Sequence, residues 1–176
     1  MQIRKNVNHR PLVGAYGAFL YFVLVAITST FLLNPSAIAG DKAYVKPSDR
    51  DKCPVCGMFV AKFPNWTAEI IYRDGIYRVF DGPKDMFKYL VDFKKYEPSR
   101  QREDIVSIYV SDYYSVHPIN AYKSLFVTGS NIYGPMGNEL VSFEKESDAA
   151  EFMKDHAGKR VLRFNDITPK VLREFE

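Results

Sequence analysis

Three sulfur atoms gather in the segment Cys53-Pro54-Val55-Cys56-Gly57-Met58, which contains both cysteines of the chain. Thiolate and thioether donors together favour Cu(I), because methionine sulfur is a poor ligand for Zn(II) and for harder ions. Gly57 lets the backbone turn tightly, so Met58 can fold toward the same point as the two thiols. The segment is therefore predicted to bind Cu(I) through Cys53, Cys56 and Met58.

Further ligands must come from other parts of the chain. Met136 lies in a loop of glycine and proline residues with no apolar stripe to join, so we expect it to be functional. Met86 and Met153 fall on the apolar faces of expected helices and are expected to pack in the core. His117 and His156 are the remaining candidates. A histidine at a helix end is also favoured as a solvated cation by the helix dipole, so both interpretations of His156 stay open.

Other uses of the cysteine pair also stay open. A structural zinc site normally needs four cysteine or histidine ligands, and this chain offers one Cys-x-x-Cys pair with two histidines after residue 39. A thiol–disulfide oxidoreductase would use Cys53 and Cys56, but its motif normally opens a long helix, and Pro64 follows too soon for that pattern. No nucleophile motif indicates a hydrolase. Most carboxylates are expected on solvated faces.

Residues 1–39 have the pattern of a targeting segment. A basic start precedes an uncharged run over residues 12–33, and Ala37-Ile38-Ala39 fits a small-x-small cleavage signature. A cleaved signal peptide is the first interpretation. An uncleaved membrane anchor is the alternative, because the uncharged run is long enough to span a bilayer. Both predict export of the remaining chain. Lipid attachment is not expected, since no cysteine precedes Cys53.

The charge of the chain is concentrated in a way that bears on its partners. All 21 acidic residues and 21 of the 24 Lys and Arg residues follow Ala39, so the part after the targeting segment is near neutral. The net charge of +3 therefore gives no support to nucleic-acid binding. The length of this part suits one compact domain or two very small ones.

The expected secondary structure repeats the order strand, strand, helix, strand after a polar linker at residues 40–52. The expected strands are 67–72, 76–80, 105–110, 121–128, 140–143 and 160–164, and the expected helices are 84–93 and 148–156. An Asp-Gly turn joins the first two strands, and Ser147 is the expected cap of the second helix. Four residues recur with a shift of 63 positions: Phe80, Asp85, Tyr89 and Asp92 match Phe143, Asp148, Phe152 and Asp155.

The repeated order predicts an α+β fold in which two small ββαβ units pack together. The first unit spans residues 53–116 and carries the cysteine motif. The second spans residues 117–176 and carries the Met136 loop. A diverged duplication would explain the shared order, with chance matches as the alternative.

Several motifs together resemble those of the NosL family, the accessory copper-binding proteins of nitrous oxide reductase maturation. The motifs are Cys56-Gly57-Met58, Tyr133-Gly134-Pro135-Met136-Gly137, Glu139-Leu140-Val141-Ser142-Phe143, Phe152 and His156-Ala157-Gly158-Lys159. The resemblance covers residues 53–164. It implies a non-enzymatic periplasmic Cu(I) carrier of two ββαβ units, with Cys56, Met58 and Met136 as metal ligands. Cys53 is a second thiol that many members lack, and Cys53 and His156 remain further candidates from the residues themselves.

The same resemblance implies the partners. The carrier would deliver copper to nitrous oxide reductase with the help of an ABC-type membrane complex. Members of the family are typically lipoproteins, and this chain lacks the cysteine that would carry the lipid. An uncleaved N-terminal anchor would replace it.

A more local resemblance connects the cysteine segment and Gly75-Ile76-Tyr77-Arg78-Val79-Phe80 with the YHS/TRASH metal-binding modules. These modules usually carry a second cysteine pair after the second strand, and Asp81 and Asp85 stand near those places here. A metal-binding or sequestration module of this type is therefore an alternative function.

Overall fold

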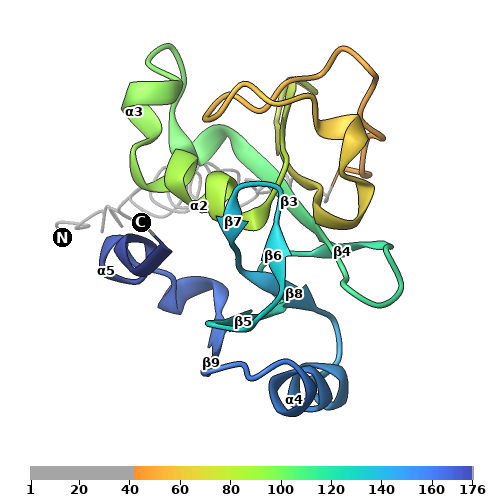
Figure 1. Cartoon of the computed structure of the whole chain (residues 1–176). Coiled ribbons are helices and arrows are strands. Elements are labelled where there is room, and N and C mark those ends of the chain that lie inside the picture. Colours follow the sequence, from red (N-terminus) through yellow and green to blue (C-terminus); the bar gives the residue numbers. More distant parts are fainter. Residues whose placement is uncertain (1–41, 176) are drawn as a thin grey trace, which may run out of the picture. The chain divides into compact units, whose positions relative to one another are not determined.

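Two antiparallel sheets, each with a helix after its second strand, form the core of the computed structural model (Figure 1). The structure describes residues 42–175, which belong to one compact unit. The mixed α+β class is as predicted. The predicted signal or anchor over residues 1–39 lies outside the described residues. Within residues 42–175, no helix is long and apolar enough to cross a membrane.

The first sheet has the strand order β2-β1-β3-β4, and every neighbouring pair is antiparallel. Its strands are β1 (Ala68–Tyr72), β2 (Tyr77–Phe80), β3 (Ile105–Ser111) and β4 (Pro118–Asn120). β1 is central and buried along its whole length. The turn from β1 to β2 has Gly75 at φ +89°, a conformation that glycine adopts without steric cost, which confirms the predicted Asp-Gly hairpin.

The second sheet has the order β8-β5-β9, again antiparallel. Its strands are β5 (Leu125–Thr128), β8 (Val141–Phe143) and β9 (Arg160–Arg163). A separate hairpin is formed by β6 (Tyr133–Gly134) and β7 (Gly137–Asn138), inside the segment predicted as a loop. Residues 121–124, which were predicted to open β5, instead form a turn after β4.

The helices within residues 42–175 are α2 (Pro83–Val91), α3 (Phe93–Tyr96), α4 (Glu146–Asp155) and α5 (Pro169–Leu172). Two of them, α2 and α4, lie close to the predicted places, and the short helices α3 and α5 are additions to the predicted elements. α2 begins with a proline, which suits the first helical turn because its missing N–H would be unpaired there. The predicted cap of α4 is wrong: Lys145 occupies that position and Ser147 lies inside the helix. Short 3₁₀ turns complete the chain at Val60–Lys62, Pro64–Trp66, Arg102–Asp104, Phe164–Asp166 and Arg173–Phe175.

The division between the two halves differs in one respect from the predicted boundary at residue 117. β4 follows that boundary but pairs with β3, through Tyr109 opposite Asn120 and Val110 opposite Ile119. The larger core cluster also joins the halves, because Phe126 and Leu140 are buried among residues of the first half. A smaller cluster around Phe143 and Phe152 belongs to the second sheet and α4.

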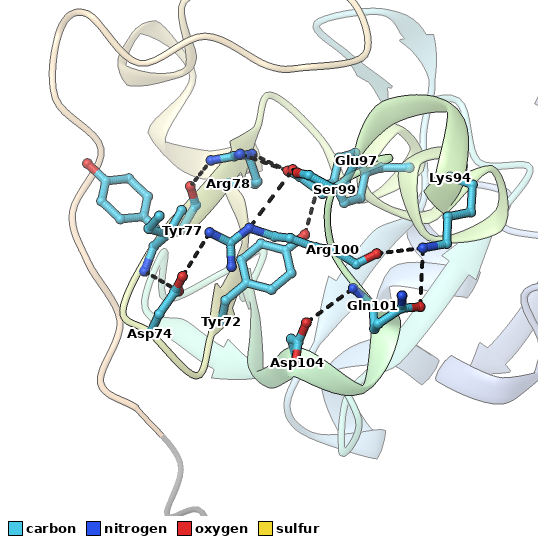
Figure 2. Close-up of polar contacts among 12 residues, drawn as sticks. Tyr72, Asp74, Tyr77, Arg78, Lys94, Glu97, Ser99, Arg100, Gln101 and Asp104 are labelled. Carbon is cyan, nitrogen blue, oxygen red and sulfur yellow. Dashed lines mark hydrogen bonds and ion pairs between the residues drawn. The ribbon is translucent and has the colours of Figure 1, made fainter.

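Polar contacts fasten the chain after α3 to the β1–β2 hairpin (Figure 2). Glu97 is buried and accepts hydrogen bonds from Arg78 Nε at 2.9 Å and Tyr89 Oη at 3.0 Å. Arg100 pairs with Asp74 in the hairpin turn at 2.8 Å. These contacts fix β2 and α2 relative to each other, and the segment that joins them carries the candidate site.

The predicted linker at residues 40–52 is bound to the sheet over its described part. Lys42 N donates to Ser107 Oγ at 2.7 Å, and Tyr109 Oη donates to Lys42 O at 2.7 Å. Val45 N donates to both carboxylate oxygens of Glu69, a buried residue of β1. The described part of the segment has no regular helix or strand, yet these four hydrogen bonds hold it across the first sheet.

Candidate metal site

The cysteine segment folds into a closed loop that directs both thiols to one side. Cys53 N donates to Met58 O at 2.9 Å, and Gly57 N donates to Cys53 O at 2.9 Å. Gly57 has φ +81°, which side chains rarely tolerate, so glycine here permits the closure. A β-bridge between Lys52 and Phe59 continues the closure outward.

Backbone amides surround the two sulfur atoms. The N–H groups of Val55 and Cys56 point to Cys53 Sγ, and the N–H of Met58 points to Cys56 Sγ. Hydrogen bonds of this kind favour the thiolate and lower a thiol pKa. Burial acts more strongly in the opposite direction: it raises the pKa of Cys56 to about 12 and that of Cys53 further above its ordinary value. Both cysteines are free thiols.

Two carboxylates lie beside the thiols. Asp81 follows β2, and Asp85 stands in the first turn of α2. Cys56 Sγ donates to Asp81 Oδ1 at 3.1 Å, and Cys53 Sγ donates to Asp85 Oδ2 at 3.4 Å. Ligand atoms of these four residues all lie within 4.8 Å of one another, which is close enough for a single metal ion to bind several of them.

The burial of these two acids makes them exceptions to the expectation that most carboxylates lie on solvated faces. Asp81 is 1% exposed and Asp85 is 4% exposed. Asp81 Oδ2 is buried without a hydrogen-bond partner among the described residues. An unpaired buried carboxylate oxygen costs free energy, which a cation at this point would offset. The N-terminal end of α2 already supplies a partial positive charge at the same place.

Met136 lies in the turn of the β6–β7 hairpin, and Lys84 holds this hairpin near the start of α2. Lys84, which precedes Asp85, donates from Nζ to Met136 O at 2.8 Å and to Asn138 O at 2.7 Å. The Met136 side chain is 48% exposed. The structure thus brings the predicted loop to the helix turn that carries the acids, and it leaves the thioether accessible. Met58 is partly buried in the cysteine loop itself.

The two histidines lie elsewhere. The ring of His156 packs on Phe152 at 4.5 Å between centroids and on Tyr113 at 6.5 Å, in the aromatic cluster of the second half. His117 is exposed before β4, and its carbonyl accepts from Asp112 N. Neither belongs to the group formed by the cysteines and aspartates. That His156 binds metal stays a prediction.

A buried glutamate connects the hairpin with the helix. Glu139 Oε1 accepts from Lys84 N at 2.6 Å and from Leu140 N at 2.9 Å, which places its carboxyl at the start of α2. Burial raises the pKa of Glu139 to about 8, against the opposing effect of these hydrogen bonds and of the Lys84 charge. A Cβ at Gly82 would lie too close to Glu139 Oε2, so any other residue there would force the Glu139 carboxyl to move.

Four residues near the site were not among the ligands predicted from the sequence: Asp81, Lys84, Asp85 and Glu139. A signal existed for the aspartates, because they stand where YHS-type modules carry a second cysteine pair. No sequence signal indicated Lys84 or Glu139. Their contacts join segments more than fifty residues apart.

Known proteins are similar to this chain in sequence and in structure. The family model described as NosL matches residues 44–172. The chain belongs to the NosL family. The copper-binding lipoprotein NosL of Stutzerimonas stutzeri is 32% identical over 177 aligned residues, which cover 96% of this chain and 87% of that protein.

A solved NosL structure also matches. The crystal structure of the copper chaperone NosL from Shewanella denitrificans has a TM-score of 0.62 and 28% sequence identity, and the match covers 74% of this chain and 98% of that one. The fold class predicted from the repeated element order therefore agrees with a solved structure of the family.

Proposed function

We propose that this protein is an exported, non-enzymatic Cu(I) metallochaperone. The observation that carries the proposal is the convergence of two free thiols in one closed loop that also contains Met58. The names of the two relatives, a copper-binding lipoprotein and a copper chaperone, support copper as the cargo. Soft sulfur donors stabilise the monovalent state over Cu(II). Cys56 and Met58 are only partly buried, so an acceptor can displace the ligands one at a time.

The proposed ligand set is Cys56, Met58 and Met136, with Cys53 as a further thiol. Titration of the reduced protein with Cu(I) against a coloured chelator should give one tightly bound ion. X-ray absorption of the loaded protein should show sulfur neighbours in excess of nitrogen or oxygen. Met58→Ala and Met136→Ala should each weaken binding, whereas Met153→Leu, in α4, should not. Absence of stoichiometric binding by the wild-type protein would refute the proposal.

The proposed acceptor is nitrous oxide reductase during its assembly, aided by an ABC-type membrane complex. This follows from the family resemblance. Copper-free reductase should acquire Cu(I) faster from the loaded protein than from a Cu(I)–chelator complex at the same copper concentration. Transfer at equal rates from both sources would refute delivery. Fractionation of cells should place the protein in the periplasm, either free or attached to the inner membrane through the segment before residue 40.

One observation favours a second candidate, a metal-sequestering module of the YHS type. Asp81 and Asp85 add two hard oxygen donors to the thiols, and a set of two sulfurs and two oxygens also suits Zn(II). Zn(II) that displaces Cu(I) from the reduced protein at comparable concentration would support this candidate. Retention of Cu(I) would support the chaperone.

The thiols argue against a thiol–disulfide oxidoreductase. Attack on a disulfide requires a thiolate, and redox-active Cys-x-x-Cys motifs lower the pKa of one cysteine. Here burial and the adjacent carboxylates raise the pKa of Cys56 to about 12. Turnover of a disulfide substrate by the reduced protein would contradict this argument.

A further inference from the structure

The hairpin that carries Met136 is attached to the molecule in an unusual way. β6 and β7 pair only with each other among the described strands, through Tyr133 opposite Asn138 and Gly134 opposite Gly137. No ladder of backbone hydrogen bonds therefore fixes the hairpin to either larger sheet within residues 42–175. Its position must come from side-chain contacts, and an exposed methionine at its tip supplies no core packing.

Lys84 supplies one of these contacts. Its side chain is buried, and its ammonium donates to the carbonyl of Met136, in the closing turn of the hairpin, and to that of Asn138, in β7. Lysine is rarely buried unless its charge is paired or fully hydrogen-bonded, so this placement indicates a specific role. Figure 1 shows β7 beside α2, the helix on which Lys84 stands.

Glu139 supplies the second contact, immediately after β7. Its carboxyl accepts a hydrogen bond from the backbone N–H of Lys84, in the first turn of α2. The side chain of the same lysine holds the turn of the hairpin at Met136. Gly134 packs against the same side chain, since a Cβ built there would lie 3.0 Å from Glu139 Cβ. Lys84 and Glu139 thus clasp the hairpin at two points.

The helix turn that forms this clasp also carries the acids of the metal group. Asp81 and Asp85 flank Lys84 in sequence, and their carboxylates lie against the thiols of Cys53 and Cys56. We infer that Lys84 and Glu139 are positioning residues that set the distance between the Met136 sulfur and the cysteine loop. This inference rests on the proposed function, in which Met136 is a ligand. Side chains that orient a metal ligand without touching the metal typically change affinity by about 10- to 100-fold.

A double-mutant cycle tests the inference. In the reduced full-length protein, Lys84→Leu should weaken Cu(I) binding by about tenfold, and Met136→Ala by a similar factor. Leucine brings no sulfur to the site. If Lys84 acts through Met136, adding Lys84→Leu to Met136→Ala should cause no further loss. X-ray absorption of the Lys84→Leu protein should show one sulfur neighbour fewer than the wild type. Lys154→Leu, at an exposed position of α4, is the matched control and should leave binding unchanged.

A second variant guards against simple misfolding. Gly134→Ala presses β6 against the Glu139 side chain without removing a charge, and it should also weaken Cu(I) binding. In the metal-free protein, the NMR signal of the Met136 methyl group should shift in Lys84→Leu but not in Lys154→Leu. Equal losses from Lys84→Leu with and without Met136, or an unmoved Met136 signal, would overturn the inference. A wild-type protein that binds no Cu(I) would instead refute the proposed function, while the methyl signal still tests the clasp.

Discussion

The two halves of the described chain share one topology and use it differently. In the first sheet β1 lies between β2 and β3, and in the second β5 lies between β8 and β9. The registers also correspond, with Ala68 opposite Phe80 and Leu125 opposite Phe143. A helix follows the second strand in both halves, and α4 begins 63 positions after α2.

Acids at corresponding places have different environments. Asp81 and Asp85 are buried at the start of α2, whereas Glu144 and Asp148, 63 positions later, are exposed and partly exposed near the start of α4. The cysteine loop makes the difference, because its thiols lie against the first pair of acids. The shared topology therefore positions an acid at a helix start, and the added loop converts that position into a candidate metal site.

A second contrast lies in the central strands. Glu69 in β1 stands at the register position that Phe126 occupies in β5. Phe126 completes the core, whereas Glu69 receives the backbone of the linker segment at Val45. The first half thus carries a buried carboxyl at a position where the second half carries a buried ring, and the carboxyl fastens the incoming chain.

The largest expected effect tests whether the halves are energetically separate. Phe143→Ala should reduce the free energy of unfolding by about 3–5 kcal/mol, because it removes a fully buried ring. Since the larger core cluster joins both halves, the whole described unit should melt in one transition at a lower temperature. Calorimetry checks this, with the exposed Val161→Ala as the control. Two separate transitions would show that the halves fold independently.

The next effect tests the assignment of the metal site to the first half. Cys56→Ser should weaken Cu(I) binding by more than about 100-fold, the upper end of what indirect partners cost, because it removes a proposed direct ligand. Asp148→Asn changes the corresponding helix start in the second half and should leave affinity unchanged. Chelator competition measures both. Equal affinities for Cys56→Ser and wild type would place the site elsewhere.

A smaller effect follows from the protonated thiols. Because burial raises the pKa of both cysteines above neutral pH, Cu(I) must displace a proton from each thiol that it binds. Apparent affinity should therefore rise with pH, by up to about tenfold per pH unit for each proton displaced. Chelator titrations between about pH 6 and pH 8 measure the slope. A flat profile would mean that the thiols are not the ligands.

The last prediction concerns Glu69. Burial raises its pKa from 4.5 to about 7. Below pH 4.5 both folded and unfolded chains hold the proton; between these values only the folded chain does, so the unfolding free energy should fall as pH rises to about 7. Glu69→Gln should flatten this part of the profile in urea unfolding, whereas Glu144→Gln should not. A profile that Glu69→Gln leaves unchanged would contradict the shifted pKa.

The sequence predicted the helices and strands better than it predicted which strands pair. The Asp-Gly turn indicated β1 and β2, and apolar residues at helical spacing indicated α2, because local patterns fix such elements. The pairing of β4 with β3 depends on register between segments, and no local pattern encodes it. The start of β5 was misplaced because Ala121 and Tyr122 have strand-like composition but form a turn that closes on Asn120.

The sulfur ligands of the candidate site could be predicted from the sequence, whereas its carboxylates could not. Cysteine and methionine are rare enough that their spacing carries meaning. Aspartate is common and usually solvated, so the burial of Asp81 and Asp85 becomes visible only once the cysteine loop is seen to cover them. The Lys84–Glu139 clasp joins segments 55 positions apart and has no sequence signature.

The bound linker also sets a length scale for attachment. The contacts of Lys42 with Ser107 and Tyr109 fix the chain at residue 42 against the first sheet. On the anchor alternative, the uncharged run that ends at Leu33 would lie in the bilayer. The stretch from residue 33 to residue 42 can then extend to about 30 Å at most, at ~3.3–3.6 Å per residue. The cysteine loop would then be confined to a thin layer at the membrane surface. An acceptor in the same membrane would encounter it by lateral diffusion along the bilayer.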